Sequence, residues 1–380
     1  MFRYLLVITW FFCFAFHSFS QDIHVGMFPN NKLKRVKFAN ATTSYHLIGD
    51  TTYIGTIDHF GFFEAIALPS KKVEVIFQGQ RYSGYERIQL VATEYNKSIE
   101  FTGISPVLKS RAFEGDFEVS NAGNYLKIVN AINLDTYLEG VVESESGTAQ
   151  KLEYYKVQSI ISRTFALKAW NKHAKDGYNL CNQVHCQAYL HKRNGSKLID
   201  SAVALTKNII LTLNDTLLAP TFFSANCGGQ TCNPIQVWNE EIPGLESFKD
   251  TFCIYSQQAK WTKKITKSEW TQFLLGKYHY PIDDSLSQTR LYDWSSDGRT
   301  AFLIHPGYGM PMRDIREHFG LKSSFFNVDQ SGDEVVLEGR GYGHGVGLCQ
   351  EGAMRMSKLG YSYLQILGYY FPSYQVKIRN

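Results

Sequence analysis

The first third of the chain consists of short apolar-rich runs separated by segments that contain glycine and asparagine. Within residues 22–108, the runs at residues 72–77 and 88–92 are typical strand signals, and no long helical period interrupts them. A second β-rich stretch follows, in which residues 116–119 and 125–129 flank a turn at residues 121–124. This arrangement predicts a β-hairpin after a β-rich N-terminal region.

Helical patterns occur only after these strand runs. The longest covers about residues 149–175, where Val157, Ile160, Ile161 and Leu167 fall on one stripe, with Gly177 as its stop and Ser146 or Thr148 as its cap. Two short helices are expected near the C-terminus. One covers residues 350–359 before Gly360, and the other begins with a Ser362/Gln365 capping box and ends before Pro372.

Strand runs followed by helices, without regular alternation, favour an α+β fold over a doubly wound sheet. We therefore expect antiparallel β-rich sheets with one long helix and short C-terminal helices. Residues 235–334 are rich in tryptophan and polar turns and show a mixed pattern, which we interpret as an insertion or subdomain.

The N-terminus has the pattern of a secretory signal peptide. Arg3 precedes an apolar stretch at residues 4–16, and small residues at positions 18–20 indicate cleavage before Gln21. The alternative is a membrane anchor, but a spanning helix needs about 20 apolar residues and this run is shorter. We expect an exported protein, periplasmic or associated with the cell wall, without a membrane span once the signal at residues 1–20 is removed.

The formal net charge of +4 is spread along the chain without a block of like charge. A protein that follows a phosphate backbone normally shows a basic stripe, so nucleic acid is not an expected partner.

Three carboxylates, Glu139, Glu143 and Glu145, lie where a strand is expected to lead into the long helix. Loops of this kind often present catalytic groups, although from spacing alone a solvated or helix-capping carboxylate is the more common case. A general acid must hold its proton near neutral pH, whereas a helix N-terminus favours the anion. Apolar burial against Tyr137, Val141 or Val142 would raise the pKa and oppose the helix dipole.

Residues 338–350 contain glycine at alternate positions, which allows close backbone approach and positive φ angles. The glycine spacing does not match a dinucleotide-binding motif, and no P-loop lysine follows. Arg340 and His344 therefore lie on either a tight structural turn or a ligand-binding loop.

Six cysteines remain after the signal. Cys181 and Cys186 have the same spacing as Cys227 and Cys232, and His185 adjoins Cys186. Such spacings suit tetrahedral zinc, but in an exported chain disulfides are the more usual arrangement. Cys253 and Cys349 are unassigned under either interpretation.

Together these residues resemble the SpoIID/LytB family, which is named for a sporulation cell-wall protein and for amidase enhancers. The resemblance covers roughly residues 111–371. Its four ordered blocks lie at residues 140–167, 180–189, 223–238 and 339–353. We expect three parts: a signal peptide at residues 1–20, a β-rich region at residues 21–110, and a catalytic domain at residues 111–375 with the insertion at about 235–334. The chain departs from the family where Ser146-Gly147-Thr148 replaces a Met-Pro type turn and where Glu143 replaces a small residue or proline.

The resemblance implies a lytic transglycosylase that cleaves peptidoglycan between N-acetylmuramic acid and N-acetylglucosamine and leaves a 1,6-anhydro end. Glu145 is then the general acid and base, and Glu143 is a charge neighbour that helps to raise its pKa. Within the matched blocks we expect substrate contacts from Arg163, Gln187, Tyr189, Ser224, Arg340, His344 and Gln350.

The family is also described with a zinc site, which implies Cys181, His185 and Cys186 as ligands and either His173 or Cys227 as the fourth. Such a zinc ion is expected to be structural, because the proposed chemistry does not require it. Disulfides remain the alternative. The main functional alternative is a non-catalytic wall-binding protein that activates an N-acetylmuramoyl-L-alanine amidase. A zinc hydrolase is less favoured because Cys-rich sites are usually closed.

Overall fold

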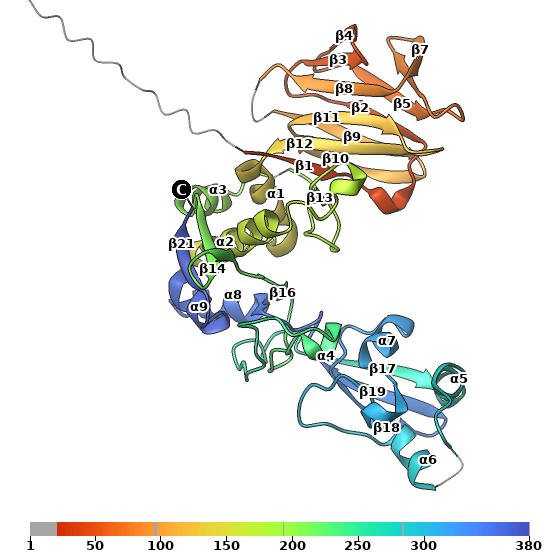
Figure 1. The fold of residues 1–380 in the computed structure, drawn as a ribbon, viewed down its shortest axis with the longest axis vertical. Coiled ribbons are helices and arrows are strands. Elements are labelled where there is room, and N and C mark those ends of the chain that lie inside the picture. The colour runs from red at the N-terminus through yellow and green to blue at the C-terminus, as the bar shows by residue number, and fades with distance from the viewer. Residues whose placement is uncertain (1–20, 95–96, 193, 283–284, 380) are drawn as a thin grey trace, which may run out of the picture.

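The computed structural model describes residues 21–94, 97–192, 194–282 and 285–379. Figure 1 shows an elongated molecule with stacked sheets at one end, a helical layer in the middle and a small α/β unit at the other end. The expected signal peptide at residues 1–20 lies outside the described residues. Among the described helices, none combines the length and apolar character needed to cross a membrane.

Two sheets packed face to face form the N-terminal part. The larger has the strand order β13-β1-β12-β11-β8-β3-β4 and the smaller β10-β9-β2-β5-β6-β7. The rings of Phe38 in β2 and Phe117 in β11 lie 5.2 Å apart between the sheets, so the apolar faces form a shared core. The strands are β1 (Asp22–Gly26), β2 (Arg35–Ala39), β3 (Tyr45–Gly49), β4 (Thr52–Ile57), β5 (Phe62–Ala67), β6 (Val73–Phe77), β7 (Gln80–Tyr85), β8 (Arg87–Ala92), β9 (Ser98–Ser105), β10 (Val107–Glu114), β11 (Asp116–Asn121), β12 (Leu126–Asn133) and β13 (Leu180–Cys181).

The strand predictions are confirmed in this part of the molecule. β6 and β8 occupy the two expected runs, and β11 pairs antiparallel with β12 as the expected hairpin. All pairs in the two sheets are antiparallel except β1 with β13. The predicted α+β class with antiparallel sheets is therefore correct.

The helical layer begins earlier than the sequence predicted. β12 leads directly into α1 (Leu134–Ser146), and the Asn133 side chain caps it by accepting hydrogen bonds from the N–H groups of Asp135 and Thr136. The three candidate carboxylates consequently lie on α1 and towards its C-terminal end. Their expected position at the N-terminus of the long helix is wrong.

The long helix is α2 (Leu152–Lys168), which is shorter than the expected residues 149–175. Its N-cap residue is Lys151, not Ser146 or Thr148, and it makes no side-chain capping hydrogen bond. Most of α2 is buried because other elements surround it. They are α1, α3 (Lys197–Leu205), β14 (Ile209–Leu213), β15 (Leu217–Leu218), α8 (Gln350–Lys358) and α9 (Tyr363–Tyr370).

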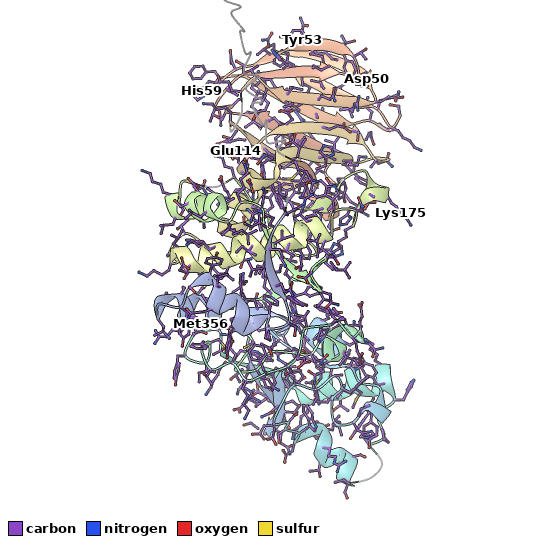
Figure 2. All side chains as sticks on the ribbon, turned by 60° about the vertical axis from the view of Figure 1, so that its left-hand side comes forward. Asp50, Tyr53, His59, Glu114, Lys175 and Met356 are labelled. Atoms are coloured by element: carbon purple, nitrogen blue, oxygen red, sulfur yellow. The ribbon has the colours of Figure 1, made fainter. Side chains whose placement is uncertain are left out.

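The C-terminal helices match the prediction closely. α8 begins at Gln350, and the Ser362/Gln365 capping box is present at the start of α9. The final strand β21 (Gln375–Ile378) pairs with β14 and returns the chain to the helical layer (Figure 1). Figure 2 shows Met356 of α8 within this layer, far from Asp50 and Tyr53 at the outer end of the sheets.

The small α/β unit has a separate hydrophobic core that includes Trp261, Trp270 and Leu337. Its antiparallel sheet has the order β17-β19-β18. A short parallel pair, β16 (Phe223–Ser224) with β20 (Leu348–Cys349), lies between this unit and the helical layer. The elements of this region are α4 (Ile235–Trp238), β17 (Lys260–Thr266), α5 (Lys267–Tyr278), α6 (Ser285–Tyr292), α7 (Met312–His318), β18 (Phe326–Ser331) and β19 (Glu334–Arg340).

Candidate functional site

Glu145 lies in the last turn of α1, and its side chain is partly buried. Its Oε1 atom accepts a hydrogen bond of 2.7 Å from the backbone N–H of Ala188. Burial raises the pKa of the Glu145 carboxyl above its ordinary value of 4.5, although the Ala188 N–H opposes the rise. The carboxyl group therefore holds its proton more strongly than an exposed glutamate does.

The same turn of α1 is joined to the loop after Cys186 by two further hydrogen bonds. The Ser144 hydroxyl accepts from the Leu190 N–H at 3.1 Å, and Glu143 Oε2 accepts from the Asn194 N–H at 2.9 Å. Three consecutive side chains of α1 thus accept backbone donors from one loop. This arrangement fixes the loop against Glu145.

Glu143 does not have the position expected for a charge neighbour of Glu145. The side chains of residues two apart on a helix point in nearly opposite directions, because they are about 200° apart around the helix axis. Glu143 is buried, and its Oε1 lies 3.9 Å from Nδ1 of His191. The rise in the Glu145 pKa comes from burial and not from the charge of Glu143.

A buried polar network connects Glu145 to the C-terminal helices. The Gln350 amide donates to the Glu145 carbonyl at 3.5 Å and to Gln158 Oε1 at 3.4 Å. Gln158 also accepts from the Tyr154 hydroxyl, which lies 3.1 Å from the Ser146 hydroxyl. Gln350 follows the loop at residues 341–347, called here the glycine loop, and thereby links the end of this loop to α1.

The glycine loop adopts the backbone that alternate glycines permit. Gly341, Gly343, Gly345 and Gly347 have φ angles of 78°, 100°, 77° and 72°, which lie in the left-handed region. The Ser224 hydroxyl accepts from the Gly345 N–H at 3.2 Å. Ser224 therefore fixes the loop beside β16.

Arg340 and His344 each lie against an aromatic ring from another segment of the chain. The Arg340 guanidinium is 3.9 Å from the centre of the Phe325 ring, and the His344 ring lies 5.2 Å from that of Trp238. Burial, assisted by nearby arginines, lowers the pKa of His344 to about 4. The hydrogen bond to the Glu145 carbonyl comes from Gln350 and not from Arg340 or His344.

Three of the expected substrate-contacting residues are almost fully buried. Arg163 is 2% exposed and pairs with Asp135 at 3.1 Å, so its guanidinium holds α2 to α1. The Gln187 amide donates to the Ser162 carbonyl at 3.2 Å. The Tyr189 ring is 0% exposed and packs beneath α1.

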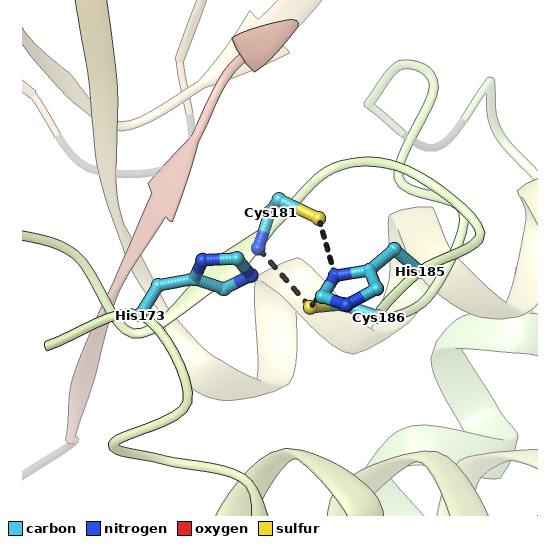
Figure 3. Close-up of side chains that lie close together, drawn as sticks. All are labelled: His173, Cys181, His185 and Cys186. Atoms are coloured by element: carbon cyan, nitrogen blue, oxygen red, sulfur yellow. Dashed lines mark hydrogen bonds between the residues drawn. The ribbon is translucent and has the colours of Figure 1, made fainter. Parts of the chain in front are cut away.

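Figure 3 shows four side chains that converge beside the loop: His173, Cys181, His185 and Cys186. Nδ1 of His185 lies 3.9 Å from both sulfur atoms. One ligand atom from each residue lies within 4.8 Å of the others. Of the two proposed fourth ligands, His173 belongs to this group, whereas Cys227 lies in a different cluster.

The second nitrogen of His173 supports a metal at this position. Its Nδ1 lies 2.9 Å from Asp176 Oδ2, which orients the ring. Its Nε2 is buried without a hydrogen-bond partner, and such an atom is costly unless a ligand uses it. A cavity of about 640 Å³, lined partly by His173, Cys181 and His185, adjoins the group.

Sequence reasoning missed several residues that shape the site. Asp176 follows His173 at a spacing that could have indicated a His–carboxylate pair. Tyr154 and Gln158, four residues apart on α2, could have been recognised as a polar pair on a buried helix face. No local signal indicates the Ala188 N–H, because its role depends on a contact 43 residues away in sequence.

Comparison with known proteins gives consistent matches. The family described as "SpoIID: Stage II sporulation protein" matches residues 122–213. The chain is 32% identical to stage II sporulation protein D of Bacillus subtilis (strain 168), over 65% of this chain and 75% of the relative. It is 29% identical to the protein of the same name in Bacillus amyloliquefaciens, with the same two coverages. It is 25% identical to the amidase enhancer of Bacillus subtilis (strain 168), over 62% of this chain and 39% of that protein.

Proposed function

Because this chain belongs to the SpoIID/LytB family, we propose that it is an exported enzyme that cleaves the glycan strands of peptidoglycan. The proposed reaction is lytic transglycosylation at the bond between N-acetylmuramic acid and N-acetylglucosamine, with a 1,6-anhydro end as product. The observation that carries this proposal is Glu145, a partly buried carboxyl group with a raised pKa, held by a loop that begins at the cysteine-histidine group.

The chemistry needs one carboxyl group that acts twice. Protonated Glu145 gives its proton to the glycosidic oxygen as the bond between that oxygen and C1 of N-acetylmuramic acid breaks. The resulting carboxylate then takes the proton of the C6 hydroxyl of the same sugar, whose oxygen forms the new bond to C1. Glu145 ends protonated, and no water is consumed. A hydrolase would need a second carboxylate to activate water or to attack the sugar.

The residues around Glu145 support this role by position. The Ala188 N–H holds one carboxyl oxygen, and Gln350 holds the backbone of the same residue. We propose that the glycine loop, which leads to Gln350, forms one wall of the glycan groove and that Arg340 and His344 contact the glycan from it. His344 would contact the sugar as a neutral ring, because its pKa of about 4 keeps it uncharged near neutral pH.

We also propose that His173, Cys181, His185 and Cys186 hold a structural zinc ion. Two sulfur and two imidazole ligands suit tetrahedral zinc, and the unpartnered Nε2 of His173 fits as a ligand atom. When bound, the ion would cross-link the turn after α2 to the start of the loop that reaches Glu145. The two cysteines are free thiols in the structure.

The proposal is tested by incubating purified glycan strands with the protein and identifying the products by mass spectrometry. We expect anhydro-ended fragments from the wild type and a loss of about 10²–10⁴ or more in rate for Glu145→Gln, because the amide has no suitably acidic proton. Glu143→Gln is the matched control and should retain turnover. Near-normal cleavage by Glu145→Gln, or inactivity of Glu143→Gln alone, would refute the assignment of Glu145.

A second function is favoured by the match to the amidase enhancer. In that case the protein binds the cell wall and activates a partner amidase, and Glu145 is a binding residue. This alternative predicts that the wild type releases no glycan fragments but increases the rate of an N-acetylmuramoyl-L-alanine amidase on intact peptidoglycan.

A further inference from the structure

Three cysteines that the proposed function does not use meet at the base of the glycine loop. Cys227 follows β16, Cys349 ends β20, and Cys253 lies in the segment that leads to β17. All three are 0% exposed, as is Asp250, whose carboxylate joins them. One ligand atom from each of these four residues lies within 4.8 Å of the other three.

The spacing of the four groups fits a tetrahedral metal site. Cys227 Sγ lies 3.4 Å from Cys253 Sγ and 3.3 Å from Asp250 Oδ2. Ligand atoms at the corners of a tetrahedron around zinc, each about 2.3 Å from the ion, lie about 3.8 Å apart. The cluster is therefore close to the size that a metal ion requires.

Neighbouring groups orient the ligand atoms as they do around bound metals. The Cys227 N–H donates to Cys349 Sγ at 3.2 Å. The Asp250 carboxylate accepts from the Tyr370 hydroxyl at 2.8 Å and from the Phe252 N–H at 2.9 Å. Hydrogen bonds of this kind hold metal ligands in place and favour their charged forms.

Gly352 in α8 allows the carboxylate to lie this close to the cysteines. A Cβ atom at this position would be 2.7 Å from Asp250 Oδ2 and 2.1 Å from the Tyr370 hydroxyl oxygen. A side chain at residue 352 would therefore require the Tyr370 hydroxyl or the Asp250 carboxylate to move.

A buried cation lies beside the cluster, where it would suit a cluster with negative charge. Arg299 is 5% exposed, donates to the Cys227 carbonyl at 2.7 Å and interacts electrostatically with Cys232 and also with Cys227 and Cys349. Burying a guanidinium is costly unless negative charge lies nearby. Three neutral thiols would not supply it, and without a metal ion only the Asp250 carboxylate of the cluster would. Three thiolates and a carboxylate around a divalent ion leave net negative charge, which Arg299 would balance in part.

A disulfide accounts for this arrangement less well. It would join two of the three sulfur atoms and leave the third as a buried thiol beside a buried carboxylate. The remaining cysteine of this region, Cys232, is not part of the cluster, because its sulfur donates to Gln236 Oε1 and to the Asn233 carbonyl.

We propose that Cys227, Asp250, Cys253 and Cys349 bind a second zinc ion. All four coordination positions come from the protein, so this site is closed and structural. The ion would join three segments that are distant in sequence and would fix Cys349, the residue before Gln350. It would thereby hold the base of the glycine loop next to α1. The proposal does not depend on glycan cleavage.

The test is the zinc content of the protein, purified without chelator and measured by mass spectrometry under native conditions and by elemental analysis. We expect about two zinc ions per chain in the wild type. Cys253→Ser and Cys349→Ser should each lower this to about one, and so should Cys186→Ser in the first cluster. Cys232→Ser is the matched control, a buried cysteine outside both clusters, and should keep both ions.

Two results would overturn the proposal. One is a single zinc ion in the wild type that only Cys186→Ser removes. The other is a disulfide between Cys227 and either Cys253 or Cys349, found by peptide mapping without reduction. If a serine variant does not fold, the zinc content and the disulfide map of the wild-type protein still test the proposal, because neither measurement needs a substitution.

Discussion

The carboxyl group of Glu145 is subject to opposing influences whose balance favours the protonated form. Burial raises its pKa, and the Ala188 N–H lowers it by a smaller amount. The residue also lies at the C-terminal end of α1, where the helix dipole is negative and disfavours an anion. The sequence had placed Glu145 at a helix N-terminus, where the dipole would act in the opposite direction. The observed position is better suited to a general acid than the expected one.

The raised pKa of Glu145 makes a prediction about stability. The folded state binds this proton more tightly than the unfolded state, so the residue lowers the free energy of unfolding as pH rises above the ordinary value of 4.5. Glu145→Gln removes this cost. We expect the difference in free energy of unfolding, variant minus wild type, to increase from pH 4 to pH 7. Denaturant unfolding at both pH values measures it.

Glu153 provides a control of opposite sign. Burial acts to raise its pKa, but hydrogen bonds from Lys156 and from the Tyr363 N–H outweigh burial and lower it. Its carboxylate therefore stabilises the fold above its ordinary pKa, and this contribution is lost as pH falls. For Glu153→Gln, the free energy of unfolding relative to wild type should decrease from pH 4 to pH 7. Equal pH dependence in both variants would contradict the environment described for Glu145.

At the scale of elements, local signals were sufficient for some predictions and insufficient for others. The β11–β12 hairpin and the capping box of α9 depend on residues close in sequence, and both were predicted. The early start of α1 was missed because its cap, Asn133, follows a strand without a break. The grouping of Cys227 with Cys349 could not be predicted either, because 122 residues separate them and only the fold brings them together.

The contact between α1 and the loop after Cys186 requires a glycine in the middle of a helix. A Cβ atom at Gly140 would lie 2.5 Å from the Tyr189 ring and 2.8 Å from the His191 carbonyl oxygen. Gly140→Ala should therefore destabilise the protein by about 1–3 kcal/mol through overpacking, despite the better helix propensity of alanine. Thermal or denaturant unfolding measures this change.

Gly368 in α9 is the matched control, because a Cβ atom there meets nothing within 4 Å. Gly368→Ala should stabilise the protein by roughly 0.5–1 kcal/mol, as expected for an unhindered helical position. A neutral or stabilising effect of Gly140→Ala would show that the loop does not pack on α1 as described.

At the scale of the whole molecule, the described residues form two hydrophobic cores of different extent. The larger runs from Ile23 to Tyr374 and includes both the stacked sheets and the helical layer. The smaller lies between Trp261 and Leu337 and belongs to the α/β unit. The sequence indicated a distinct pattern at residues 235–334, but residues 245 and 253 of that range pack in the larger core. Their membership depends on long-range packing, which composition does not reveal.

Two separate cores predict two unfolding transitions in calorimetry. Leu138 and Trp270 are both 0% exposed and belong to the larger and the smaller core respectively. Leu138→Ala should cost about 2–5 kcal/mol and Trp270→Ala about 3–5 kcal/mol, because each leaves a cavity. Since the α/β unit joins the rest of the chain at one end of its sheet, where Lys260 of β17 pairs with Arg340 of β19, each variant should lower one transition temperature and leave the other nearly unchanged. A single transition that both substitutions lower equally would mean that the two cores unfold as one cooperative unit.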